Sequence, residues 1–360
     1  VVFWIDLTVI SLQFLFYIFG YSYNDYYFRL NRDNWKKYNI SSETMISMPE
    51  DSRFGIGPNN ILRGPDDFYG KDCFTKIEEF KSKGYSVAAN GTCYSKDKQG
   101  FLPALMEKMY VERKMYKKKM IDCQKRQQAG EKNLEKDIAK YNNFQLVRKI
   151  QLNSAYGAIG NQYFRYYTLE NAEAITLSGQ VEIRWIESKM NNYLNKLLKT
   201  QDIDYVIASD TDSIYLNMDP LVETVYKGRE KTTEGIVSFL DKICSVELEK
   251  YIENSYQELA EYVNAYDQKM QMKRETIADR GIWTAKKRYI LNAWDVEGVR
   301  YEEPKLKIMG IEAVKSSTPA PCRQMIKDGL KIVMSKTEKE IISYIDNCRK
   351  IFNNLSPEEI

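Results

Sequence analysis

Two carboxylates separated by one residue are the clearest candidates for chemistry in this sequence. Asp210 and Asp212 stand within the run 207–216, Ile-Ala-Ser-Asp-Thr-Asp-Ser-Ile-Tyr-Leu, whose apolar ends and polar centre predict a β-hairpin. Side chains two residues apart on extended backbone point the same way, so both carboxylates can face one point. Like charges at one point need a neutralising cation, and a pair of Mg²⁺ ions clamping a transferring phosphoryl group would supply it. A solvated acidic hairpin is the simpler interpretation of these residues alone.

The composition narrows the possible catalytic chemistry. The 360 residues include no His, which excludes His-ligated metals, His acid–base catalysis and Ser-His or Cys-His nucleophilic sites. The six Cys residues are scattered without a Cys-x-x-Cys pair, which predicts reduced thiols rather than a disulfide framework or a zinc site. An enzyme of this composition has to use carboxylates, Lys, Arg, Tyr or bound metal.

Basic residues are concentrated in one part of the chain. The net charge is only +3, but residues 101–150 hold 13 Lys and Arg against 6 Asp and Glu. This excess fits first of all a solvated helix face, and otherwise a track for phosphate groups. The 27 Tyr residues include candidates for lining a nucleic-acid groove, although most are expected to pack within the protein.

The apolar pattern predicts the elements that position these groups. The expected helices are 103–128, 132–158, 171–199, about 231–265 and 322–351. The expected strands and hairpins are 1–8, 86–94, 205–216 and 282–312. The first two helices, joined by a break at Ala129-Gly130, predict an antiparallel pair. The order of elements therefore predicts an α+β body with an inserted helical projection.

A second candidate site lies on one face of the predicted helix 132–158. Its residues are spaced i, i+4, i+7, i+8 and i+11 and are Lys149, Asn153, Tyr156, Gly157 and Gly160. Arg113 and Lys117, spaced i, i+4 on the preceding helix, are expected opposite. Glycine costs about 1 kcal/mol in a helix interior, so two on one stripe indicate the close approach of a flat group such as a base pair. A crowded helix–helix contact explains the glycines equally well.

Five blocks of the sequence resemble family B DNA polymerases, in particular those of T-even-type bacteriophages. Residues 149–157 resemble the fingers motif, and residues 160–167 resemble a further phage-type block. Residues 209–213 resemble the metal-binding turn of the palm, and residues 283–289 resemble the primer-template motif. Residues 303–310 with 315–319 resemble the phage-type end of the palm. They occur in the family's order and span most of residues 39–320.

The resemblance implies a role for each matching residue. Asp210 and Asp212, with Asp6 as a third catalytic carboxylate, would bind two Mg²⁺ ions, and Glu275 matches an acidic position near them. A solvated or salt-bridged side chain explains Glu275 equally well. The incoming nucleotide would be held by Arg113, Lys117, Lys149, Asn153, Tyr156 and Gly157, and Lys149 would also be catalytic. The primer-template backbone would be contacted by Lys286, Lys287, Arg288 and Tyr289.

The resemblance also implies a domain layout, a function and partners. The palm, an antiparallel sheet with helices, would comprise 1–100 and 161–310, with an antiparallel two-helix fingers domain at 101–160 and the start of a truncated helical thumb at 311–360. The implied function is template-directed DNA synthesis, in which a primer 3′-hydroxyl attacks the α-phosphate of a dNTP. The implied partners are primer-template DNA, dNTP, a sliding clamp for the full-length protein and, as an option, a separate chain that supplies an exonuclease and thumb. The implied location is the cytoplasm of an infected bacterial host.

The sequence departs from the family pattern soon after Asp6. The first metal motif should continue into Ser-Leu-Tyr-Pro-Ser, whose Tyr excludes ribonucleotides, but residues 9–13 read Val-Ile-Ser-Leu-Gln and the pattern resumes only at Asn39. An insertion, an unspliced intervening sequence or a frameshift would explain residues 9–38. We favour an artefact of sequence or translation, because codons for Val-Ile-Ser-Leu can encode Leu-Tyr-Pro in the next frame. We therefore expect this segment to pack poorly and Asp6 not to converge with Asp210 and Asp212.

The ends of the chain predict an internal piece of a longer protein, without the family's exonuclease, most of its thumb or its clamp-binding tail. A nucleic-acid-binding remnant without catalysis is the alternative function. An RNA polymerase with a similar palm is disfavoured by the fingers helix and by the block 286–289. The apolar run 7–20 is shorter than the roughly 20 residues that span a bilayer, and no basic segment precedes it, so we expect neither a membrane anchor nor a signal peptide.

Overall fold

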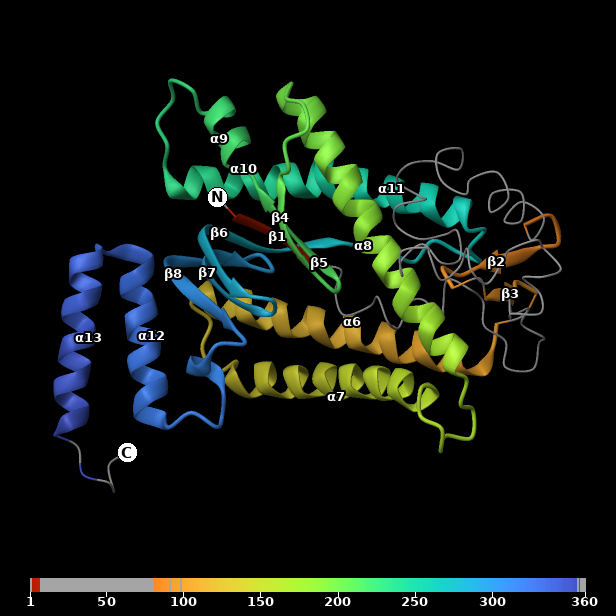
Figure 1. Ribbon diagram of the computed structural model, residues 1–360, viewed down its shortest axis with the longest axis horizontal. Helices are drawn as coiled ribbons and strands as arrows, with labels where there is room; N and C mark the ends of the chain where they lie inside the picture. Colours follow the sequence, from red (N-terminus) through yellow and green to blue (C-terminus); the bar gives the residue numbers. More distant parts are fainter. Residues whose placement is uncertain (1, 7–80, 91, 98, 355, 357–360) are drawn as a thin grey trace, which may run out of the picture. The chain divides into compact units, whose positions relative to one another are not determined.

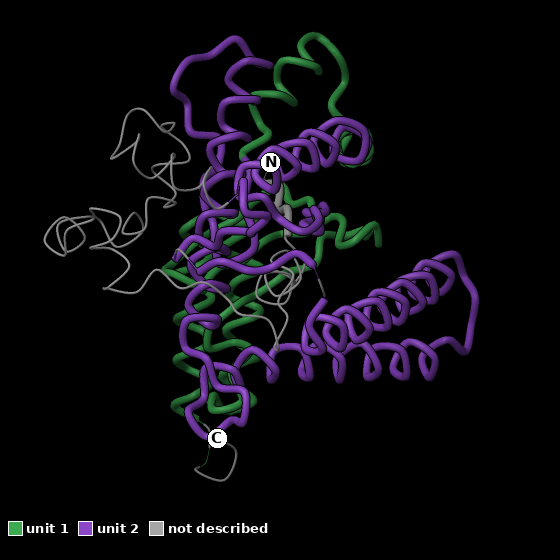
Figure 2. Tube along the Cα trace, turned by 90° about the vertical axis from the view of Figure 1, so that its right-hand side faces the viewer, with its two compact units in different colours: residues 1–4, 217–241, 275–360 green, residues 5–216, 242–274 purple. Residues whose placement is uncertain are grey.

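The computed structural model describes residues 2–6, 81–90, 92–97, 99–354 and 356 (Figure 1). Of residues 2–6 it describes the backbone. The chain divides into two compact units (Figure 2): unit 1 comprises residues 1–4, 217–241 and 275–360, and unit 2 comprises residues 5–216 and 242–274. Both units combine helices with small antiparallel sheets, as the α+β prediction expects.

A long helical hairpin dominates one part of unit 2. Helices α6 (Phe101–Gln128) and α7 (Glu135–Ile159) run antiparallel and pack side by side, as Figures 1 and 2 both show. Pro103 lies in the first turn of α6, where its missing N–H leaves no intrahelical bond unmade. The connection turns through Gly130 at φ 97° and Asn133 at φ 67°. The predicted pair is confirmed, with the first helix starting two residues earlier than expected.

Aromatic and charged side chains form the seam between α6 and α7. Arg148 of α7 forms an ion pair with Glu112 of α6 at 3.0 Å, and its guanidinium carbon lies 5.1 Å from the ring centroid of Tyr116. The Tyr116 ring also packs against Phe144 (5.0 Å between centroids) and Tyr141 (6.4 Å). These contacts set which faces of the two helices meet.

The rest of unit 2 is organised around α8 (Leu169–Leu198). Its buried stripe, which includes Ile175, Val181, Ile186 and Met190, recurs at helical spacing. It packs on α11 (Glu249–Tyr262), which follows the π-helical segment η2 (Cys244–Leu248). Strands β2 (Tyr85–Val87) and β3 (Cys93–Ser95) form the hairpin predicted at 86–94.

The hairpin that carries the paired carboxylates packs on the same helix. Strand β4 (Val206–Asp210) pairs antiparallel with β5 (Ser213–Asn217), with a register irregularity between Val206 and Ala208. β4 contacts α8, and residues 213–216 of β5 are buried. Strand β1 (Val2–Asp6) is the neighbour of β5. The hairpin prediction at 205–216 is confirmed.

Unit 1 is built on an antiparallel meander. Strands β6 (Lys273–Ala285, in unit 1 from Glu275), β7 (Arg288–Val296) and β8 (Val299–Met309) are joined by two-residue turns. Helix α12 (Ala320–Ser335) packs on the short helix η3 (Glu312–Val314) and on α13 (Glu338–Asn353). The hydrophobic core of unit 1 includes Ile290, Ile311, Ala313 and Met334.

Two predicted helices differ from the observed elements, and one observed helix was not predicted. The helix expected at about 231–265 is observed as α10 (Thr233–Ile243), η2 and α11 in direct succession. The π-helical hydrogen bonding of η2 interrupts the α-helical pattern. A short helix, α9 (Asp219–Val225), was not predicted. The helix expected at 322–351 breaks at Thr337, whose side chain and Glu340 form a reciprocal cap that starts α13. No helix in the described part of the chain is long and apolar enough to cross a membrane, and the run 7–20 lies outside that part.

Candidate active site

The paired carboxylates lie at the tip of the β4–β5 hairpin. Asp210 pairs with Ser213, so Thr211 and Asp212 form the connection. The N–H of Asp212 donates to the carbonyl oxygen of Asp210 at 2.6 Å, across Thr211 at φ 56°. A β-branched residue rarely adopts this left-handed conformation, and such outliers gather at functional sites. The Thr211 hydroxyl donates to Asp210 Oδ1 at 3.0 Å, which further fixes the turn.

Two asparagines of α8 hold the start of the strand that leads to this turn. Asn191 Oδ1 accepts the N–H groups of both Tyr205 (2.8 Å) and Val206 (3.0 Å). One turn later, Asn195 Nδ2 donates to the carbonyl oxygen of Ile203 at 2.7 Å, and its Oδ1 accepts the N–H of the same residue at 3.1 Å. These side chains supply the backbone partners that a neighbouring strand would otherwise provide. The approach to Asp210 is therefore fixed to α8.

A third side chain of α8 reaches β4 next to the carboxylates. Burial raises the pKa of Glu187 above its ordinary value, whereas Arg184 and a hydrogen bond with Ser209 act in the opposite direction. Ser209 directly precedes Asp210. Sequence reasoning did not find Asn191, Asn195 or Glu187, because polar residues on an amphipathic helix give no sign of the strand that they contact.

The chemistry of the turn fits a hard divalent cation. Asp210 and Asp212 are both half-buried and offer carboxylate oxygens, which Mg²⁺ prefers. Across the described ranges, no group of three or more Asp, Glu, Cys or His gathers in one place. Asp6 ends β1, the strand beside β5, but its side chain lies outside the described residues. The expectation that Asp6 does not converge with Asp210 and Asp212 stays a prediction.

The expected packing of residues 9–38 also lies outside the described residues. This includes the side chains on which the prediction depends, Leu12, Phe14, Phe16 and Phe19.

Three basic residues of the helical hairpin, Arg113, Lys117 and Lys149, fall on one side of its seam. Glu112 and Tyr116 of α6 face Arg148 of α7. In an antiparallel pair, the next residue along each helix is rotated toward the same side of the contact. Residues 113, 117 and 149 therefore share one side of the seam, and their joint role in holding a nucleotide stays a prediction. Arg113 is buried (5% exposed), whereas Lys117 and Lys149 are half-exposed.

The end of α7 presents the predicted nucleotide face. Asn153 and Gly157 are exposed and Tyr156 is half-buried. Burial raises the pKa of Tyr156, while a hydrogen bond with Thr176 of α8 opposes that shift. A Cβ added at Gly157 would meet no described atom within 4 Å, but one at Gly160 would lie 3.6 Å from Ala172. A contact at 3.6 Å is an ordinary van der Waals contact, so crowding among the described residues explains neither Gly160 nor Gly157.

The predicted primer-template block forms the β6–β7 turn of unit 1. Lys286 and Lys287 are exposed and connect the paired residues Ala285 and Arg288. Arg288 forms an ion pair with Glu312 at 2.5 Å. Tyr289 is only 5% exposed, with its ring centroid 6.4 Å from that of Trp283. The two lysines are therefore the most accessible members of the block.

A glycine holds this turn in place. Gly310, at φ 66°, follows β8, and a Cβ there would lie 2.1 Å from the carbonyl oxygen of Lys287. No side chain fits at that separation, so the close approach of the two backbones requires glycine.

Comparison with known proteins decides the family. The model of "DNA polymerase family B" matches residues 35–359. The chain belongs to this family. The match confirms the family that the five sequence blocks predicted.

Two curated family B relatives come from bacteriophages. The DNA-directed DNA polymerases of Enterobacteria phage T4 and Escherichia phage RB69 are 35% and 36% identical to the chain over 324 and 317 residues. These alignments cover 76% and 74% of this chain but 36% and 35% of the relatives. The chain thus spans about a third of the length of the curated relatives. A DNA polymerase of Pyrococcus glycovorans is 24% identical over 68% of this chain and 27% of its own length.

One residue that the family pattern associates with the metal site has a cationic neighbour. Glu275 of β6 forms an ion pair with Lys307 of β8 at 2.5 Å, and both side chains are mostly buried. This is the salt-bridged state, one of the two interpretations given to Glu275. Its role near metal stays a prediction.

Proposed function

We propose that this family B chain carries the nucleotidyl-transfer site of a DNA-directed DNA polymerase. The observation that carries the proposal is the strained turn at the tip of β4–β5, which brings Asp210 and Asp212 together in a chain of this family. In the proposed reaction, the primer 3′-hydroxyl attacks the α-phosphorus of a dNTP and pyrophosphate leaves. The curated phage relatives are named for the same activity.

The proposed metal ligands are Asp210, Asp212 and Asp6, with Glu275 nearby. Two bound Mg²⁺ ions would stabilise charge on the attacking and leaving oxygens. The protein's own contribution is to hold carboxylates on a rigid turn, and the Thr211 hydroxyl and the α8 asparagines serve that purpose. Phosphoryl transfer needs positioning and charge stabilisation, which suits a chain without His.

The proposed nucleotide site lies on the helical hairpin. Lys117 and Lys149 would hold the triphosphate together with Arg113 and Asn153, and Tyr156 with Gly157 would contact the new base pair. Lys286 and Lys287 would contact DNA phosphates, with Arg288 and Tyr289 supporting that turn. Such backbone contacts position DNA without reading its sequence. The fingers, palm and thumb boundaries at 101–160, 161–310 and 311–360 belong to the same proposal.

Metal-dependent primer extension tests the assignment. We expect Asp210→Ala and Asp212→Ala to lower extension at least about 10³-fold, because a lost metal ligand removes several kcal/mol of transition-state stabilisation. Binding of primer-template DNA, measured by fluorescence anisotropy, should remain within about twofold, since few phosphate contacts are lost.

A matched control is Asp122→Ala, because Asp122 is an exposed carboxylate of α6 far along the chain from the turn. It should leave extension unchanged. An Asp212→Ala protein that extends primers at the parent rate would contradict the proposal. A parent protein that binds DNA and never extends it would instead support a binding remnant.

The remaining partners are proposals of the same kind. They are a sliding clamp for the full-length protein, a separate chain that supplies exonuclease and thumb, and action in an infected bacterium. Only the last of these is supported by the phage origin of the relatives.

A further inference from the structure

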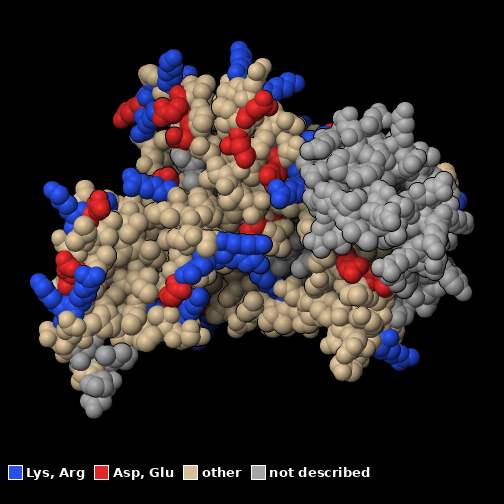
Figure 3. All heavy atoms as spheres, in the orientation of Figure 1, with Lys and Arg blue, Asp and Glu red and all other residues tan. Residues whose placement is uncertain are grey.

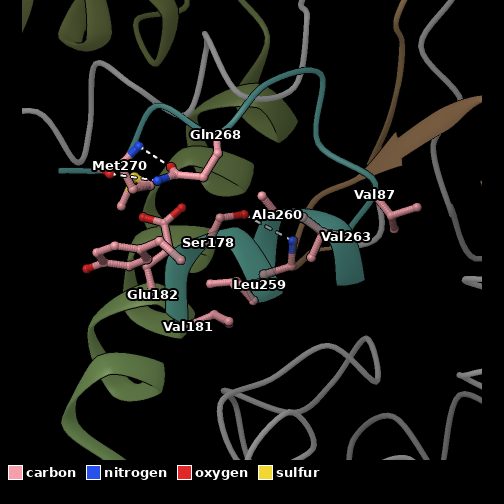
Figure 4. Close-up of a pocket in the computed structure, with 11 residues that line it drawn as sticks. Val87, Ser178, Val181, Glu182, Leu259, Ala260, Val263, Gln268 and Met270 are labelled. Carbon is pink, nitrogen blue, oxygen red and sulfur yellow. Dashed lines mark hydrogen bonds between the residues drawn. The ribbon is translucent and has the colours of Figure 1, made fainter. Parts of the chain in front are cut away.

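A small cavity lies within unit 2, between α8, α11 and the chain segments beside them. Its volume is about 20 Å³, enough for one water molecule. Figure 4 shows its lining residues, which come from both helices, from residues 87–89 and from residues 268–270. The polar members of the lining are Ser178, Glu182, Tyr256 and Gln268.

Two of these polar side chains each bury an oxygen atom that has no hydrogen-bond partner among the described residues. Glu182 is 5% exposed and Tyr256 is 1% exposed. Among the described residues, neither Glu182 Oε2 nor the Tyr256 hydroxyl has a hydrogen-bond partner. Buried polar atoms in folded proteins are almost always satisfied by protein or by ordered water, and leaving one unsatisfied costs about 1–3 kcal/mol.

The other two polar side chains already have partners. Ser178 Oγ accepts the N–H of Ala89 at 3.1 Å. Gln268 Oε1 accepts the N–H of Met270 at 2.5 Å, and its Nε2 donates to the carbonyl oxygen of the same residue at 2.9 Å. Figure 4 shows both sets of bonds at the edge of the cavity. The unmet hydrogen-bonding capacity is therefore concentrated on Glu182 and Tyr256.

We propose that this cavity is a binding site for one ordered water molecule, which bridges the Glu182 carboxyl group and the Tyr256 hydroxyl group. Water can both donate and accept, so one molecule satisfies a carboxyl oxygen and a phenolic hydroxyl together. A metal cation is a poorer match, because one carboxylate lines the cavity and the other walls are apolar or already hydrogen-bonded.

The burial of Glu182 favours the protonated, uncharged form of its carboxyl group. Burial raises the pKa of Glu182 well above its ordinary value. The titratable group that faces it is Tyr256 of α11, whose own pKa is raised by burial and then by the charges of Glu182 and Asp212. Residues 87–89 and 268–270 add no charged side chain to the lining.

Crystal structures of the full 360-residue chain and two variants test the water site. We expect one water peak within hydrogen-bonding distance of both residues in the parent protein and in Glu182→Gln, which preserves shape and polarity. Tyr256→Phe removes one partner and should lower the occupancy of that peak. A dry cavity in the parent protein would overturn the proposal. A peak that is replaced by Rb⁺ on soaking would overturn it too, in favour of a cation site.

Thermal unfolding against pH gives a second, independent test. A carboxyl group whose folded pKa is raised stays protonated in the folded state while the unfolded state loses its proton. Parent stability should therefore fall as pH rises from about 4.5 toward the folded pKa, relative to Glu182→Gln. The melting temperature of Glu182→Gln should exceed that of the parent more at pH 8 than at pH 5.

The control for this test is Glu173→Gln, an exposed carboxyl of the same helix, which should follow the parent curve at every pH. Parallel curves for the parent and Glu182→Gln would show a Glu182 that titrates normally, which contradicts a buried neutral site. Neither test depends on polymerase activity.

Discussion

Gly157 lies on a face of α7 where the described residues leave space for a side chain. It is exposed, and a Cβ there would meet no described atom within 4 Å. Alanine is favoured over glycine in a helix interior by about 1 kcal/mol. Glycine at this position therefore costs helix stability, although packing among the described residues does not require glycine there. Such a cost is expected where a surface must leave room for a ligand.

The substitution Gly157→Ala separates the ligand explanation from a structural one. We expect it to raise the free energy of unfolding by roughly 0.5–1 kcal/mol, measured by urea denaturation, because the helix gains propensity. If a base pair passes over this face, the added methyl group should also lower kcat/KM for dNTP by about tenfold or more.

The control for Gly157→Ala is Ser154→Ala, an exposed position one turn earlier on α7. It should raise stability slightly and leave extension unchanged. A Gly157→Ala protein that gains stability with full activity would mean that no ligand touches this face.

The turn at Asp210 was predictable at the residue scale, and its supports were not. Apolar residues on both sides of a polar centre predict a hairpin, and the two-residue spacing of Asp210 and Asp212 predicts that their carboxylates lie on the same side. The bonds from Asn191 and Asn195 join residues of different elements, so no local pattern contains them. Glu182 was missed for a related reason, since a charged residue on a helix is expected at the surface.

The helices themselves were the best-predicted elements. The antiparallel pair 103–128 and 132–158 appears as α6 and α7 because two long helical segments separated by a glycine break have few alternatives. The closing helix was predicted as one piece, although Thr337 and Glu340 have the spacing of a capping box. The signal was present, and the uninterrupted apolar pattern on either side of it hid the break.

Seam contacts make the helical hairpin a testable element. Lys149 shares one side of the α6–α7 seam with residues 113 and 117. We expect Lys149→Ala to raise KM for dNTP and to lower kcat, with a loss in kcat/KM of roughly 10- to 100-fold, because a charged hydrogen bond to phosphate is removed. Steady-state primer extension at varied dNTP concentration measures both terms.

The control for Lys149→Ala is Lys118→Ala, which removes an exposed lysine of α6 one position beyond residue 117. It should leave both kinetic terms within about twofold, as an exposed charge makes a small contribution. Equal effects of the two variants would mean that the basic side of the hairpin is only a solvated face.

At the scale of the whole molecule, charge is distributed locally. The net charge is +3, yet Figure 3 shows Lys and Arg side chains grouped in places on the face drawn, not spread evenly over it. DNA affinity should therefore depend on particular lysines. Affinity should also fall steeply with salt, since each neutralised phosphate releases counterions.

The β6–β7 turn provides a quantitative form of this expectation. Changing Lys286 and Lys287 together to Gln should reduce the slope of log affinity against log salt by about two, or one per phosphate contact. Anisotropy titrations between low and moderate salt measure the slope. Lys227→Gln, at an exposed lysine of another loop, is the control and should leave it unchanged. An unaltered slope in the double variant would remove this turn from the DNA interface.

The family followed from the sequence because five blocks in order are hard to meet by chance. The division into two units could not be predicted from the sequence, because each unit is assembled from segments that lie far apart in the chain. Strand β6 was expected to begin near residue 282 and begins at Lys273, because its first residues pair with the end of β7 and owe their conformation to that partner.

The asparagine bonds from α8 also determine where the gene can tolerate changes in length. Thr200 is hydrogen-bonded to Asn195, so only residues 201 and 202 form a connection that the asparagines do not hold. Codons gained or lost there alter a surface connection while Asn195 still holds Ile203. From Val206 onward the situation reverses. One codon added before Asp210 would shift the strand by a residue and turn every following side chain to the opposite face. Length variation among related genes should therefore occur at 201–202 and stop at Ile203, where the asparagine bonds resume.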